Sequence, residues 1–157
     1  MAIAGLNHAV LYVRDATASA AFYGDVLGFT VVEADRSGRA VFVRAPASTN
    51  HHDLGLFTVG PGAGPAAVGR SVGLYHLAWE VERIEDLAAL SDKLSAAGVL
   101  VGASDHGVSK SLYAKDVDGI EFEVMWRVPP DLWGDAEHRG VVQPLDLARE
   151  LERFGST

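Results

Sequence analysis

Two histidines stand at matching positions of a motif that occurs twice in the chain. The segments GLNHAVLYV and GLYHLAWEV begin at Gly5 and Gly73, and both read Gly-Leu-x-His before alternating toward a valine. This repeat makes His8 and His76 equivalent. The chain has no cysteine, so a bound metal would need ligands from histidine, aspartate, glutamate or backbone groups. Imidazole is the commonest protein ligand for metals, which makes the histidine pair a candidate metal site.

A carboxylate near the second motif could complete such a site. In IEFEVMW, Glu121 and Glu123 share one face of a predicted strand because side chains alternate along a strand. If the repeated segments pair edge to edge, His8 and His76 meet and one of these carboxylates joins them. Two imidazoles and a carboxylate suit non-haem Fe(II), with Mn(II) as the alternative. Spacing leaves both glutamates open as the ligand, and it leaves each histidine open as an ordinary hydrogen-bonded strand residue.

An adjacent histidine pair precedes an apolar run in HHDLGLF. His51 and His52 could belong to a metal site, or one of them could transfer protons, because a histidine side chain titrates near neutral pH. Asp53 could orient a neighbouring imidazole or cap the start of the following strand. Glu80 shares a predicted strand face with His76, and we expect it to be an exposed partner in a charge pair.

The elements that must position these residues also occur twice. Each motif strand is followed by a helix, one capped by Asp15 and ending near Gly28, the other stopping at Gly98. Short strands follow, in FTVVEAD, RAVFVRA and DLGLFTV of the first half and SKSLYAKD and IEFEVMW of the second. The sequence therefore predicts an α+β fold in which two tandem βαβββ modules, about 5–60 and 73–127, form a curved mixed sheet around a metal cleft. The segment GPGAGPAAVG, residues 60–69, is predicted to be a flexible linker.

The tail, residues 128–157, lies outside the repeat. VPPDLWGD is predicted to be irregular, and QPLDLARELERF to be helical with Pro144 in its first turn. Leu147, Leu151 and Phe154 would form one apolar stripe that packs on the body or on a partner. We expect residues 1–157 to form one domain, and we expect a homodimer because exposed strand edges and apolar surface favour self-association.

Composition excludes several classes of protein. The formal charge of -8 opposes binding to nucleic acid or to an anionic membrane. The first residues, MAIAGLNHAV, lack the basic stretch of a secretory signal, and no apolar run approaches the roughly 18 residues of a membrane span. We therefore expect a cytoplasmic protein.

The ordered motifs LNHAVL, NHHDLGLF, LYHLAWEV, DHGVSKSLY and DVDGIEFEV resemble the vicinal oxygen chelate superfamily. Within it, the chain from Leu6 to Trp126 is most similar to small type I extradiol ring-cleavage dioxygenases. The resemblance implies that three residues hold the metal: His8, His76 and Glu123. It also implies three catalytic residues: His52 as an acid–base group, Tyr113 bonded to a substrate oxygen, and His106 close to it. His51 would then be structural or at the surface, and the spacing from His106 to Tyr113 departs from the best-known members.

The activity implied is Fe(II)-dependent cleavage of a catechol-type aromatic diol by O2. The alternatives are a glyoxalase-type metal-dependent isomerase or lyase, and a non-catalytic drug-binding protein of the bleomycin-resistance kind. Glyoxalase-type sites commonly have a fourth ligand, a carboxylate on the last strand of the first module. Here the position equivalent to Glu123 is predicted near Leu56 or Phe57, neither of which binds metal. This favours a dioxygenase, although a shift of register toward Asp53 would weaken the inference.

Overall fold

A computed structural model describes residues 2–64, 66 and 72–156 of the chain. Most of the second half of the predicted linker therefore lies outside the described residues. Contacts divide the chain into two compact units. Unit 1 is Met1–Ala66 together with the turn Asp116–Gly119, and unit 2 is Ala67–Lys115 together with Ile120–Thr157.

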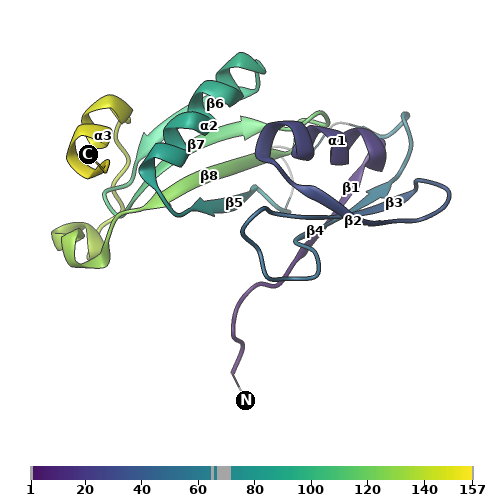
Figure 1. Ribbon diagram of the computed structural model, residues 1–157, viewed down its shortest axis with the longest axis horizontal. Coiled ribbons are helices and arrows are strands. Elements are labelled where there is room, and N and C mark those ends of the chain that lie inside the picture. The colour runs from purple at the N-terminus through teal and green to yellow at the C-terminus, as the bar shows by residue number, and fades with distance from the viewer. Residues whose placement is uncertain (1, 65, 67–71, 157) are drawn as a thin grey trace. The chain divides into compact units, whose positions relative to one another are not determined.

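Unit 1 is a four-stranded sheet covered by one helix. It contains β1 (Ala9–Val13), α1 (Ala16–Leu27), β2 (Thr30–Ala34), β3 (Ala40–Arg44) and β4 (Leu54–Thr58). The strand order is β1-β4-β3-β2, with β1 parallel to β4 and the other pairs antiparallel. α1 lies across one face of this sheet (Figure 1), where it covers the buried strand residues Leu11, Val13, Val41, Val43, Leu54 and Leu56.

The ends of α1 follow the signals in the sequence. The Asp15 side chain accepts hydrogen bonds from the amides of Thr17 and Ala18, which stabilises the first turn. The helix ends at Gly28, whose φ of 76° is a left-handed conformation that glycine adopts without steric cost.

Unit 2 repeats the same topology. It contains β5 (His76–Val81), α2 (Ile84–Ala96), β6 (Leu100–Asp105), β7 (Ser109–Lys115) and β8 (Glu121–Arg127). The order is β5-β8-β7-β6, with β5 parallel to β8. α2 packs Ile84, Leu87 and Leu94 into a core with Leu112, Phe122 and Val124. The predicted α+β fold with two βαβββ modules and a helical tail is confirmed, and β1 and β5 are each an edge strand of a separate mixed sheet.

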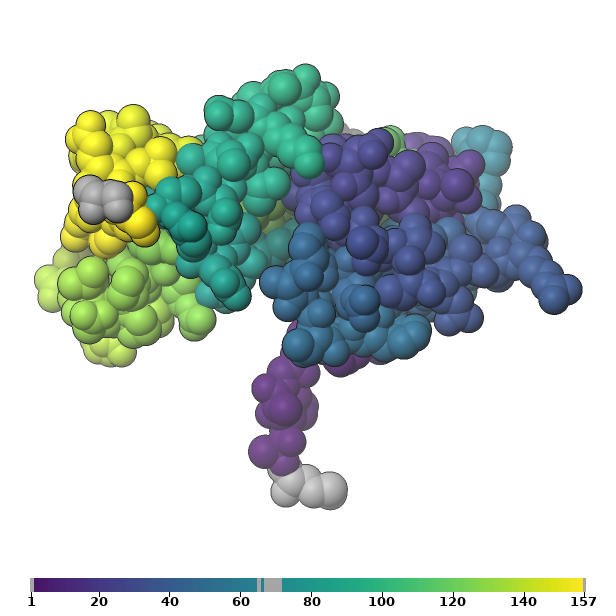
Figure 2. Space-filling model, viewed as in Figure 1, coloured from purple at the N-terminus to yellow at the C-terminus, as the bar shows by residue number. Residues whose placement is uncertain are grey.

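The tail packs on unit 2. The stretch predicted to be irregular forms two short 3-10 helices, η1 (Pro130–Leu132) and η2 (Gly134–His138). α3 (Leu147–Phe154) begins after Asp146, which caps it by accepting from the Arg149 amide at 3.1 Å, so Pro144 precedes the helix and is not in its first turn. The α3 atoms lie against α2 (Figure 2). No helix within 2–64, 66 and 72–156 has the length and apolar character needed to cross a bilayer.

Candidate active site

The parallel pairing of β5 with β8 brings His76 and Glu123 together in unit 2. The register sets His76 opposite Glu121 and Ala78 opposite Glu123. His76 Nε2 lies 3.1 Å from Glu123 Oε2, whereas His76 Nδ1 is 4.0 Å from Glu121 Oε1. Among the described residues, the buried Nδ1 of His76 has no hydrogen-bond partner. The closer carboxylate is therefore that of Glu123, and the pair supplies an imidazole and a carboxylate of the kind that hold divalent metals.

His8 and His52 lie together in unit 1. His8 is exposed and directly precedes β1, so it does not belong to the strand as predicted. Its ring is 4.6 Å from the ring of His52, centroid to centroid, and His52 in turn lies 5.0 Å from the ring of Phe42. Phe42 alternates along β3 with the buried Val41 and Val43, so its ring lies on the other face of the sheet.

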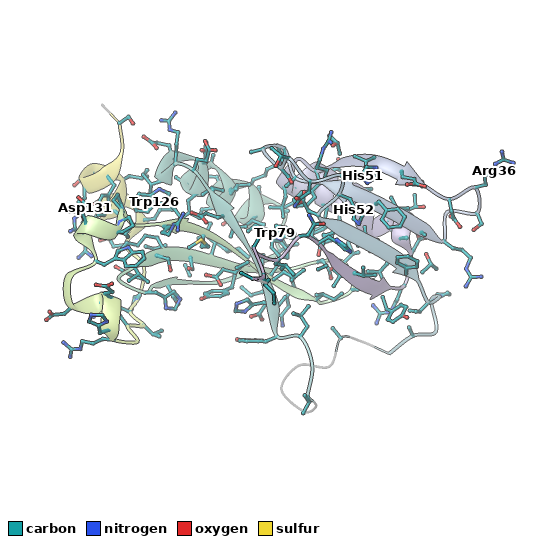
Figure 3. The ribbon with its side chains drawn as sticks, turned by 90° about the horizontal axis from the view of Figure 1, so that it is seen from below. Arg36, His51, His52, Trp79, Trp126 and Asp131 are labelled. Carbon is teal, nitrogen blue, oxygen red and sulfur yellow. The ribbon has the colours of Figure 1, made fainter. Side chains whose placement is uncertain are left out.

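His51 and His52, both labelled in Figure 3, are neighbours on the loop before β4. Their surroundings differ. His51 is exposed, and its Nδ1 lies 3.1 Å from Nδ1 of His52. His52 is half-buried between His8 and Phe42. Of the two, His52 is therefore the one placed beside His8.

The Asp53 carboxylate holds together the loop between β3 and β4. Its carboxylate accepts from the Ala45 amide, from Ser48 Oγ and from Asn50 Nδ2, each at 2.8 Å. Burial alone would raise the pKa of Asp53, but these hydrogen bonds outweigh it and lower the pKa below its usual value. Asp53 is therefore an ionised residue that organises the loop, and its carboxylate oxygens are occupied by that task.

The orientation of His8 follows from Asp53. Asn50 Nδ2 donates to Asp53 Oδ1 and to the Asn7 carbonyl, and both of these atoms can only accept. Asn50 Oδ1 therefore faces the Asn7 amide nitrogen, at 3.0 Å, and Asn7 Oδ1 accepts from His8 Nδ1 at 2.8 Å. This chain of hydrogen bonds requires the proton of a neutral His8 on Nδ1, which leaves Nε2 with the lone pair that a metal needs.

The position on β4 equivalent to Glu123 is Gly55. Val10 pairs with Gly55 in the same way as Ala78 pairs with Glu123. The prediction of Leu56 or Phe57 was therefore out of register, although β4 has no acidic residue in any register. A Cβ added at Gly55 would lie 3.3 Å from Phe42 Cε1 and 3.4 Å from Phe57 Cε2, so aromatic rings take the space of a side chain.

Tyr113 and His106 stand beside the His76–Glu123 pair. Tyr113 on β7 is opposite Glu123 on β8, and its ring centroid is 5.8 Å from that of His76. Burial, followed by the charge of Glu123, raises the pKa of Tyr113, so its phenol is neutral at physiological pH. His106 Nε2 lies 2.8 Å from the Tyr113 hydroxyl, and His106 Nδ1 lies 2.9 Å from the carbonyl oxygen of Val141.

The predicted residues thus form two groups, one in each unit. Unit 1 holds His8 and His52, and unit 2 holds His76, Glu123, Tyr113 and His106. No cluster of three or more acidic or histidine side chains arranged for metal binding occurs within the described part of the chain. Each group nevertheless contains atoms of the kind that bind metals. In unit 1, the hydrogen bond from His8 Nδ1 to Asn7 leaves His8 Nε2 with a lone pair. In unit 2, the His76 imidazole lies beside the Glu123 carboxylate.

Comparisons with known proteins fit this repeated architecture. Residues 5–124 match the sequence profile of the Glyoxalase/Bleomycin resistance protein/Dioxygenase superfamily. The chain belongs to this superfamily. Relatives include a manganese-dependent 2,3-dihydroxybiphenyl 1,2-dioxygenase of Geobacillus genomosp. 3, with 28% identity over 80% of this chain and 38% of the relative. A catechol-2,3-dioxygenase of Bacillus subtilis is 28% identical over 96% of this chain and 52% of the relative.

A biphenyl-2,3-diol 1,2-dioxygenase of Paraburkholderia xenovorans is 30% identical over 78% of this chain and 41% of the relative. This superfamily member thus spans about two fifths to one half of the length of these curated relatives. These relatives are named as dioxygenases, one of them manganese-dependent, and each is longer than this chain.

Several solved structures share the fold of this chain. A glyoxylase/bleomycin resistance protein/dioxygenase domain from Frankia superimposes with a TM-score of 0.68 at 24% identity, covering 81% of this chain and 100% of that one. A lactoylglutathione lyase from Agrobacterium tumefaciens gives 0.60 at 24% identity, with coverages of 84% and 98%. The fosfomycin resistance protein FosX of Listeria monocytogenes, in complex with Mn(II), gives 0.63 at 18% identity, with coverages of 87% and 100%. Proteins with different names therefore share this fold, and the fold alone does not identify an activity.

Proposed function

We propose that this protein is a metal-dependent extradiol dioxygenase that cleaves the ring of a catechol-type aromatic diol with O2. His8, His76 and Glu123 hold the metal, Fe(II) or Mn(II), and leave coordination positions open. The dioxygenase names of the curated relatives support the assignment. The main structural support for a dioxygenase is the residue at position 55. Gly55 lies where a glyoxalase-type isomerase commonly has a carboxylate as its fourth metal ligand.

The chain's own side chains would handle the substrate and its protons. The metal supplies Lewis acidity and a template for two vicinal oxygens. The neutral phenol of Tyr113 forms a hydrogen bond with a substrate oxygen, and His52 accepts or returns a proton. Phe42 and Phe57 offer aromatic surface beside His52, against which an aryl ring packs favourably.

Assembly and location are part of the same proposal. The chain is a homodimer, since its modules leave edge strands and exposed apolar residues such as Leu6, Tyr12 and Leu74. It works in the cytoplasm, where reduced iron is available to it. Sedimentation at low concentration tests the dimer, and a mass of a single 16.6 kDa chain would contradict it.

The activity is tested with purified protein loaded anaerobically with Fe(II) or, in parallel, Mn(II). A panel of catechols is added with O2, and ring fission is followed by the appearance of the yellow product. His76→Ala and Glu123→Ala abolish metal binding and turnover. The matched control is His138→Ala, because the His138 side chain is 83% exposed and lies in η2.

Three results would contradict parts of this assignment. Full metal occupancy in Glu123→Ala with loss in Glu121→Ala would move the ligand by two residues. Turnover of a glutathione hemithioacetal with no ring cleavage would favour an isomerase of the glyoxalase kind. Tight binding of bleomycin by a protein that takes up no metal would favour a drug-binding protein.

A further inference from the structure

The loop that carries His106 is held in place by the C-terminal tail. Asp105 and Gln143 form a two-way backbone bridge, with N–O distances of 2.8 and 2.9 Å. Val141 lies in the chain between η2 and Gln143. Its carbonyl oxygen is 2.9 Å from His106 Nδ1. The tail is therefore bonded to the residue before His106 and to the His106 side chain itself.

A buried ion network joins α3 to the hairpin of β6 and β7, whose loop carries His106. Lys110 Nζ lies 2.6 Å from Asp105 Oδ1 and 3.2 Å from Glu150 Oε2, and only 4% of the Lys110 side chain and 1% of the Glu150 side chain are exposed. Burial alone would raise the pKa of Asp105, but the bonds from Lys110 and the Gly107 amide lower it. The Phe154 ring of α3 also packs on Trp126 of β8, labelled in Figure 3, with centroids 5.1 Å apart. The tail is thus fixed on both sides of the segment that contacts His106.

Gly107 allows the close approach of the tail. Its φ is 77°, and a Cβ added there would lie 2.7 Å from the Cβ of Ala136 in η2. A real side-chain carbon cannot occupy that position without a shift of the backbone on one side. The absence of a side chain at Gly107, next to His106, therefore lets η2 pack closely against this loop.

The tail determines which nitrogen of His106 carries the proton. A carbonyl oxygen can only accept, so the 2.9 Å contact with Val141 requires a proton on Nδ1. In the neutral ring Nε2 then has a lone pair and accepts the Tyr113 hydroxyl proton at 2.8 Å. Because the Tyr113 hydroxyl donates its proton to His106, the Tyr113 oxygen can only accept a hydrogen bond from any other group.

From this geometry we propose that the C-terminal tail is a positioning element of the active site, and that the carbonyl of Val141 makes Tyr113 a hydrogen-bond acceptor for a substrate hydroxyl. This rests on the proposed function and specifies which group of the diol Tyr113 contacts: a hydroxyl that still carries its proton. The proton of that hydroxyl passes to the Tyr113 oxygen as the Tyr113 proton passes to His106 Nε2. The substrate oxygen gains a negative charge, Tyr113 remains neutral, and His106 becomes an imidazolium whose Nδ1–H stays bonded to Val141.

The first test uses the metal-free protein without substrate. Nitrogen-15 NMR distinguishes the two imidazole tautomers, and we expect a neutral His106 with its proton on Nδ1 and a slowly exchanging Tyr113 hydroxyl proton. In Gly107→Ala, which displaces η2, we expect a mixture of tautomers. Gly140→Ala is the matched control, because a Cβ added there meets no described atom within 4 Å.

A wild-type His106 with its proton on Nε2 overturns the inference whether or not Gly107→Ala folds. So does an unchanged His106 tautomer in a folded Gly107→Ala protein whose tail has become sensitive to proteolysis. Since neither measurement needs metal or turnover, a failed ring-cleavage assay leaves this test valid.

The second test uses the metal-loaded enzyme and a catechol that it cleaves. Gly107→Ala should lower kcat at least tenfold with a smaller change in KM, while Gly140→Ala keeps both. Equal kcat values for Gly107→Ala and wild type would overturn the role of the tail in catalysis, even where the dioxygenase activity itself is present.

Discussion

Asn50 donates a hydrogen bond to Asp53 at 2.8 Å. This bond determines which atom donates in two further hydrogen bonds, one between Asn7 and Asn50 and one between His8 and Asn7. Because the Asp53 carboxylate only accepts, the Asn50 amide has a single possible orientation, and Asn7 and His8 follow from it. In the proposed metal site, the ligand His8 would thereby be oriented by Asp53, an acid that is not itself one of the proposed ligands. Supporting bonds of this kind typically change metal affinity about 10–100-fold when they are removed.

Asn7→Leu should weaken Mn(II) binding by about 10–100-fold, since it removes the acceptor for His8 Nδ1. Asn7→Asp should retain most of the affinity, because a carboxylate still accepts from His8. Calorimetric titration of the metal-free protein measures both constants. Equal losses in the two variants would show that the loop, and not the His8 proton, determines the affinity.

Asp53→Asn should destabilise the protein at neutral pH, by about 1–3 kcal/mol on the scale of a broken buried hydrogen-bond network. The pKa of Asp53 is lowered in the folded protein, so its contribution to stability is present above the unfolded pKa and is lost as pH falls through the lower folded value. Urea unfolding at several pH values tests this. The difference between wild type and variant should shrink below about pH 4, the ordinary range for aspartate, and a constant difference would contradict the role of the charge.

Gly55→Ala should destabilise unit 1 because the new methyl group enters a space filled by Phe42 and Phe57. Overpacking of this kind typically costs about 1–3 kcal/mol. Phe42→Leu removes the nearest atoms, so the double variant should regain part of the loss. A double-mutant cycle from urea denaturation measures this coupling, and purely additive effects would show that the Phe42 ring does not restrict Gly55.

The elements of each module could be predicted from the sequence because the patterns that indicate them are local. The Gly-Leu-x-His motifs, the Asp15 cap and the alternation that buries Leu11 and Val13 depend on neighbouring residues only. The segment LVGASD was not recognised as a strand because it contains Gly, Ala and Asp, which are depleted in strands. Pairing with β7 and the bridge from Asp105 to Gln143 impose its conformation.

The candidate site was predictable in its side chains but not in their supports. The equivalence of Gly55 with Glu123 follows from the same offset that relates His8 to His76, but only if neither module contains an insertion. The strand register shows that this condition holds. The contact from Val141 uses a backbone carbonyl, and every residue type has one, so no sequence pattern marks it. The same holds for Asn7, whose role appears only when Asn50 and Asp53 are folded beside it.

His52 is predicted to transfer protons without binding the metal. Its ring lies against His8 and Phe42, half-buried, whereas His51 is exposed. His52→Gln should therefore retain the metal and bind catechol, yet lower kcat by about 10²–10⁴-fold, the usual contribution of a general acid or base. A loss in kcat that exceeds the loss in affinity would place His52 in the chemical steps, provided that chemistry limits turnover.

His51→Gln is the matched comparison for His52, because it changes the adjacent imidazole while leaving the contacts of His52 with His8 and Phe42 in place. It should reduce kcat far less, and stopped-flow turnover of both proteins at equal metal occupancy gives the ratio. An essential His51 beside a dispensable His52 would move the assignment by one residue. Loss of metal from His52→Gln, measured by elemental analysis, would instead make His52 a ligand, and His8 would then share its metal with the neighbour whose ring it touches.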